Sequence, residues 1–135
     1  MKTLKKAVIL CTLVGAMGGV SGQQSPEAPE ALLRHVVLFK FKADTPEAKL
    51  REIEAAFLEL PSKIPQIVHM EWGINNSPEG LNKGLTHGFL LTFRSEADRD
   101  AYLPHPDHKA FGEVAGPYIE DVVVLDYWAR EKAAD

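Results

Sequence analysis

The chain has 135 residues, of which 45% are hydrophobic, and a formal net charge of −4. This length and apolar content suffice for one globular domain with a single core. The acidic balance, without any basic stripe, argues against nucleic-acid binding.

The N-terminus has the layout of a secretory signal peptide, with lysines in residues 2–6, an apolar run over 7–20 and small residues before a predicted cut after Gly22. Residues 1–22 are therefore expected to be removed, and the protein to be exported to the periplasm or the exterior without a membrane attachment. The alternative is a retained anchor, although an apolar run of about 14 residues is shorter than the roughly 20 that span a bilayer. Cys11 leaves with the signal, so the mature chain has no thiol for disulfides, catalysis or zinc.

Residues 23–31 contain two prolines among mostly polar side chains, which is typical of a flexible linker. The predicted domain covers residues 32–131. Its first strand starts at Leu32, with His35, Val37, Phe39 and Phe41 on one face and Val36 and Leu38 on the other. Both faces are partly apolar, so we expect both to be covered.

A helix follows, with Thr45 and Pro46 at the N-cap and first-turn positions and apolar residues at helical spacing until Pro61. A second strand is predicted over residues 67–74 and a third over residues 86–93. Each of these strands carries apolar side chains in alternation.

The segment after the third strand contains two predicted helix starts. Ser95 and Asp98 form a capping box for a short helix that ends near Leu103. Pro106 opens another helix, with His105 as its N-cap. The last strand is predicted over residues 119–128.

This order of strands and helices predicts a ferredoxin-like βαββαβ arrangement of the α+β class. From right-handed crossovers we expect the first and third strands to lie side by side and parallel. His35 and His87 would then project from the same end of the sheet. The segment from Tyr102 to His108 would return to that end, and the four rings would meet at the mouth of an apolar pocket.

Three segments resemble the stress-responsive A/B barrel domain family, also called Dabb: HVVLFKFK at 35–42, THGFLLTF at 86–93 and YLPHPDHKAF at 102–111. The resemblance extends from Leu33 to Arg130. It implies an antiparallel sheet with helices on one face and a homodimer that closes a dimeric α/β barrel. A second copy would cover the apolar strand faces on which we place Val36, Leu38, Val122 and Val124.

The resemblance also implies site residues, through a plant member of the family that closes a linear polyketide by an intramolecular aldol reaction. Its catalytic base corresponds to His108 and its tyrosine to Tyr102, and two further pocket histidines correspond to His35 and His87. His108 would act as general base and Tyr102 as partner of a carbonyl or enolate oxygen. The position of His108 in the first turn of a helix also favours a neutral imidazole.

Each candidate also has a structural interpretation. His35 and His87 would order the fold by bonding to backbone or to each other, and His105 would only cap its helix. Phe89 and Trp72, the remaining candidates for ligand binding, would belong to the core.

A metal site at His35, His87 and His108 is the third option, but their spacing matches no short metal motif, and no cofactor is predicted. We favour an exported homodimer that binds a small apolar carbonyl ligand as a binding or stress-response module. The alternative is a lyase or polyketide-cyclase-like enzyme.

Overall fold

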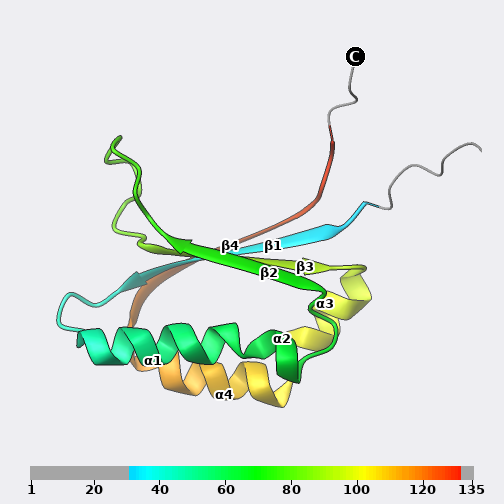
Figure 1. Ribbon diagram of the computed structural model, residues 1–135, viewed down its shortest axis with the longest axis horizontal. Coiled ribbons are helices and arrows are strands. Elements are labelled where there is room, and N and C mark those ends of the chain that lie inside the picture. The colour runs from blue at the N-terminus through cyan, green and yellow to red at the C-terminus, as the bar shows by residue number, and fades with distance from the viewer. Residues whose placement is uncertain (1–30, 132–135) are drawn as a thin grey trace, which may run out of the picture.

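The computed structural model describes residues 31–131, so the predicted signal peptide and nearly all of the predicted linker lie outside the described residues. Four strands form one sheet, and the helices lie on one of its faces (Figure 1). The elements in chain order are β1 (Leu33–Phe41), α1 (Glu47–Leu58), α2 (Leu60–Lys63), β2 (His69–Ile74), β3 (His87–Phe93), α3 (Glu96–Tyr102), α4 (Pro106–Ala115), the 3₁₀ turn η1 (Gly116–Tyr118) and β4 (Ile119–Trp128). The ferredoxin-like α+β prediction is thus confirmed.

The strands lie in the order β2-β3-β1-β4, and every neighbouring pair is antiparallel. The prediction that the first and third strands are parallel is therefore wrong. The α1 crossover makes β1 and β2 run the same way, but β3 turns back from β2 and inserts between them. His35 consequently lies opposite Leu91, whereas His87 lies opposite Phe39, at the other end of the sheet.

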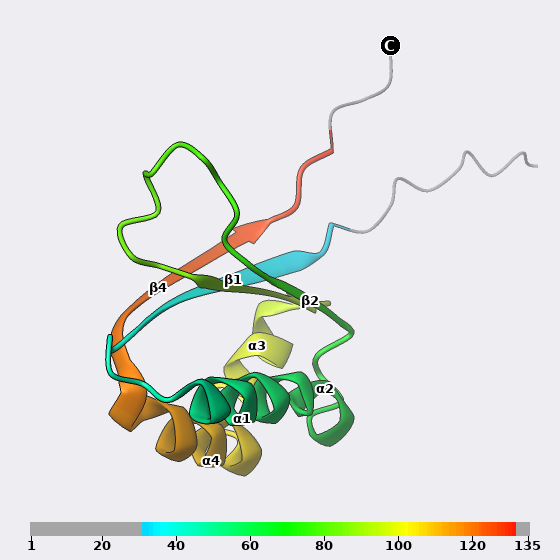
Figure 2. The same cartoon turned by 60° about the vertical axis from the view of Figure 1, so that its left-hand side comes forward.

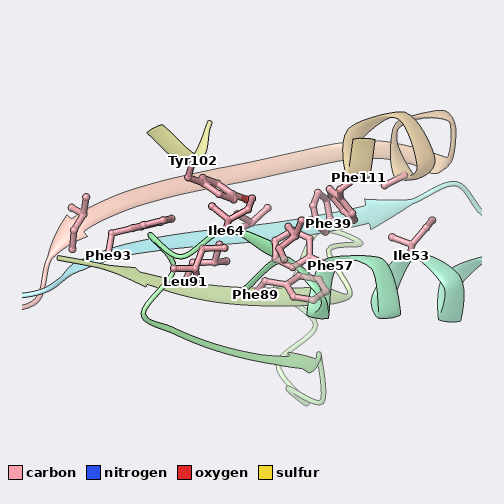
Figure 3. Close-up of a cluster of buried hydrophobic side chains, with 14 residues drawn as sticks. Phe39, Ile53, Phe57, Ile64, Phe89, Leu91, Phe93, Tyr102 and Phe111 are labelled. Atoms are coloured by element: carbon pink, nitrogen blue, oxygen red, sulfur yellow. The ribbon is translucent and has the colours of Figure 1, made fainter. Parts of the chain in front are cut away.

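The sheet and the helices form two layers (Figure 2), and the buried core side chains lie between them. Aromatic rings from both layers dominate it, and Figure 3 shows Tyr102 entering the layer from α3 and Phe111 from α4. The Phe57 and Phe89 ring centroids are only 4.1 Å apart. Burial of such side chains stabilises a fold by about 1.5–3 kcal/mol each.

The strand register also corrects the predicted outer face of β4. Val122 and Val124 lie opposite Phe39 and Val37, on the side of the helices. The outward-facing residues are instead Val123 and Leu125, which lie opposite Leu38 and Val36. The apolar outer surface of β1 and β4 predicted from the sequence exists, but its β4 members are shifted by one residue.

The helix starts match the sequence patterns at α3 and α4 but not at α1 and α2. The Ser95 hydroxyl accepts a hydrogen bond from the Asp98 backbone, and His105 caps α4, as predicted. At α1 the N-cap is Pro46 rather than Thr45, and no side chain caps the helix. The first helix was predicted to continue until Pro61, but α1 ends at Leu58, and Pro61 lies in the first turn of a separate helix, α2, where the missing N–H is tolerated. Within residues 31–131, no helix has the length and apolar character needed to cross a membrane.

Candidate active site

A cavity of about 410 Å³ lies between β1, β4 and the helices α3 and α4. Most of its lining is apolar, and its polar side chains come from three elements. The lining residues are His35, Val37, Phe39, Phe57, Tyr102, Leu103, His108, Lys109, Phe111, Gly112, Gly116, Ile119, Val122 and Val124. Three of the predicted site residues, His35, Tyr102 and His108, are thus brought together.

Tyr102 is the last residue of α3 and is 0% exposed. Its hydroxyl is buried and has no hydrogen-bond partner among residues 31–131. An unpaired buried hydroxyl is costly, and burial raises the pKa of this phenol well above its ordinary value of 10.0. Tyr102 therefore stays protonated, and its hydroxyl is an unused hydrogen-bond donor in the wall of the cavity.

His108 lies in the first turn of α4, and its ring centroid is 4.3 Å from that of Tyr102. Its Nδ1 is 2.9 Å from the Leu103 carbonyl oxygen. Because a carbonyl can only accept, Nδ1 carries the hydrogen, and Nε2 of the neutral ring keeps its lone pair. The loop between α3 and α4 thus holds His108 in the tautomer that a base at Nε2 requires.

His35 enters the same cavity from β1 and is only 4% exposed. Its Nδ1 donates to Asp126 Oδ1 at 2.6 Å, and its ring lies edge-on to Tyr102 with a centroid distance of 5.8 Å. Arg99 of α3 donates to the second oxygen of Asp126 at 2.9 Å. A chain of charge-assisted bonds therefore joins α3, β4 and β1 beside the cavity.

The other predicted residues lie elsewhere. His87 bonds Glu54 of α1 through Nε2 at 3.0 Å and Thr86 through Nδ1 at 2.8 Å, so both ring nitrogens are engaged. It is four positions along the strands from His35, about 13 Å at 3.3 Å per residue. Trp72 lies on the edge strand β2 and stacks on the buried Phe89, and neither residue lines the cavity.

Asp126 and Arg99 are the functional candidates that sequence reasoning missed. A signal for Asp126 was available, because it is a carboxylate that continues the alternation of Val122 and Val124 near the end of an apolar strand. Arg99 had a weaker signal, since it precedes Tyr102 by three residues and so shares its helix face.

Two further hollows, of about 460 and 380 Å³, lie over the sheet face opposite the helices. Their titratable residues are Lys83, Glu71 and His87, and the His87 ring nitrogens are already bonded. In the described part of the chain, no group of three or more His, Cys, Asp or Glu side chains could hold a metal ion. Acid–base chemistry therefore points to the cavity of Tyr102 and His108.

Fold and cavity together define a ferredoxin-like α+β domain with a small-molecule site between its sheet and its helices. Comparison with known families makes this specific. The chain belongs to the family described as Stress responsive A/B Barrel Domain (Dabb), whose sequence profile matches residues 33–129. The resemblance predicted from the three motifs is confirmed.

Individual relatives include two enzymes. Olivetolic acid cyclase from Cannabis sativa is 29% identical over 99 residues, covering 73% of this chain and 98% of the cyclase. Hydroxynitrile lyase from Passiflora edulis is 28% identical with a TM-score of 0.72, covering 78% of this chain and all of the lyase. A dimeric ferredoxin-like protein of unknown function from Bacteroides fragilis is 28% identical with a TM-score of 0.60, covering 73% of this chain and 96% of that protein.

Proposed function

We propose that the protein binds a small, largely apolar carbonyl compound in this cavity and removes a proton from it. His108 Nε2 acts as the general base, and Tyr102 donates a hydrogen bond to the carbonyl or enolate oxygen. The observation that carries the proposal is the buried Tyr102 hydroxyl, which has no partner among residues 31–131 and lies beside a histidine of fixed tautomer. A ligand oxygen would satisfy the phenol.

The reaction balances as one proton transfer. A C–H or O–H bond of the ligand breaks, its proton moves to His108 Nε2, and the electron pair forms an enolate or alkoxide held by Tyr102. Ring closure by an aldol step and release of a carbonyl compound from a hydroxynitrile both begin in this way. The names of the cyclase and the lyase relatives support this reaction class for the chain.

We also propose that the protein is a homodimer. Support comes from the dimeric relative and from the outer face of β1 and β4, where Val123 and Leu125 are 42% and 58% exposed. Apolar side chains in such a row are typical of a face that a second sheet covers. Export to the periplasm or exterior remains a separate proposal, which rests on the composition of residues 1–22.

A second candidate is a binding or stress-response module without turnover. The hydrogen bond between His35 and Asp126 favours it, because that bond ties β1 to β4 as the bond of a structural residue would. The family description, stress responsive, is compatible with either role.

Exchange of α-protons of heptan-2-one in D₂O, followed by proton NMR, separates these candidates. His108→Ala and Tyr102→Phe should each slow the catalysed exchange about 100-fold. His69→Ala is the matched control, because His69 is exposed on β2 and outside the cavity. Ketone binding without exchange would support the binding module, and exchange that survives His108→Ala would refute the assignment of the base.

A further inference from the structure

From α4 the cavity is lined by His108, Lys109, Phe111 and Gly112, and Gly116, the C-cap of the helix, also lines it. Three of these residues, His108, Gly112 and Gly116, are four positions apart, so they form one stripe that runs from the first turn of α4 to its C-cap. The histidine stands at the end near Tyr102, and the glycines continue toward Ile119 and β4. Beyond the base, this stripe has no side chains, and the neighbouring α4 side chains that line the cavity are those of Lys109 and Phe111.

Nothing within the described chain explains why these two residues are glycine. Neither has a positive φ, a conformation that favours glycine. A Cβ atom added at either position would meet no atom within 4 Å. Glycine also weakens a helix relative to alanine, so Gly112, inside α4, carries a cost without a visible benefit.

An independent feature of the same cavity points to a ligand, namely the fully buried Tyr102 hydroxyl without a partner among residues 31–131. The polar groups His35, Tyr102 and His108 gather at one end. The lining then continues along β1 to Phe39, about 13 Å from His35 at 3.3 Å per residue. The cavity is therefore polar at one end and apolar along the arm that the glycines border.

We propose that Gly112 and Gly116 form the wall of a subsite for an apolar chain, and that their missing side chains set the length of chain accepted. The inference rests on the proposed ligand class, a neutral carbonyl compound whose oxygen binds at Tyr102. Its alkyl chain would lie along α4 in the space that a Cβ would otherwise enter. These glycines are specificity-determining and take no part in proton transfer.

The test is a series of methyl ketones from butan-2-one to nonan-2-one, titrated against the purified protein by NMR chemical shifts. Burial of one methylene contributes about fourfold in affinity, so the wild type should bind longer ketones progressively more tightly until the arm is full. Each carbon added at Gly112 should displace about one ligand methylene. Gly112→Ala should weaken nonan-2-one binding about fourfold and Gly112→Val about 50-fold, with butan-2-one unaffected.

Two measurements distinguish this role from a structural one. Gly112→Ala should raise the melting temperature by about 4–8 °C while it weakens binding of the long ketone. Ala110→Val is the matched control, because Ala110 is exposed on α4 and outside the cavity, and it should leave the binding series unchanged. If Gly112→Val does not fold, Gly112→Ala still decides the question.

The inference is overturned if both glycine variants bind the series as the wild type does, or if they weaken short and long ketones equally. It is also overturned if their effect is a change of oligomeric mass in light scattering, because the glycines would then face a second copy. Failure of the proposed function gives a different result. If the protein catalyses no proton exchange but its affinity for ketones still depends on chain length, the assignment of His108 as the base is wrong and the subsite proposal stands.

Discussion

Removal of the Asp126 carboxylate should destabilise the domain, because it leaves a buried imidazole N–H without its acceptor. Asp126 accepts from His35 Nδ1 at 2.6 Å and from Arg99 at 2.9 Å. The His35 side chain is 6% exposed and that of Asp126 25%, so water cannot freely replace the carboxylate at the imidazole. Asp126→Ala is therefore the variant to measure.

The expected cost follows from His35 alone. A buried donor left unsatisfied costs about 1–3 kcal/mol, and loss of the Arg99 bond acts in the same direction. For a domain of this size, the melting temperature should fall by on the order of 10 °C. Thermal and urea denaturation followed by circular dichroism measures both quantities.

Asp121→Ala is the matched control, because Asp121 lies on the same strand and its carboxylate bonds, among residues 31–131, only the adjacent backbone N–H of Val122. It should change the free energy of unfolding by less than about 0.5 kcal/mol. A double-mutant cycle with His35→Leu isolates the pair and should give a coupling of about 1 kcal/mol or more. Equal effects of the two aspartate variants, or a coupling near zero, would refute the reasoning.

Three other outcomes are expected. Burial raises the pKa of Tyr102, so the contribution of its protonated form to the free energy of unfolding is complete below about pH 10 and declines above it by at most about 1.4 kcal/mol per pH unit. Tyr102→Phe should flatten this alkaline decline in stability, measured by urea titration at several pH values. An unchanged slope would contradict the burial argument. Leu125→Asp should convert the proposed dimer to a monomer in light scattering, whereas Leu58→Asp, at an exposed position on α1, should not. Equal masses for the wild type and both variants would count against the sheet interface. Mass spectrometry of the exported protein should find Gln23 as its first residue, and a cytoplasmic protein that retains residues 1–22 would exclude the signal peptide.

The sequence was sufficient for the order of the strands and the main helices and for the family, and α3 and α4 begin with specific capping patterns. Ser95 and His105 accept backbone hydrogen bonds as their positions predict. The three motif segments then fixed the fold class. These features are local or nearly so, and local chemistry determines them.

The parts that failed depend on how distant segments meet. The direction of β1 relative to β3 follows from the insertion of β3 between β1 and β2, which no alternation within one strand records. The sequence could not show which β4 residues point to the helices and which point outward. Residues 122–125 are all apolar, so no alternation of polar and apolar side chains distinguishes the two faces. Only the pairing of His35 with Asp126 across the strands resolves it.

The network around Asp126 also explains how a very short helix can hold a site residue in place. α3 has seven residues, too few to be stable alone, so contacts with the sheet must fix its position. Arg99 and Tyr102 are three residues apart on α3 and share a face, so the bond from Arg99 to Asp126 also holds the phenol beside His35. Loss of that bond would loosen Tyr102 and His35 together, and for this reason we expect stability and ligand chemistry to be coupled at this end of the cavity.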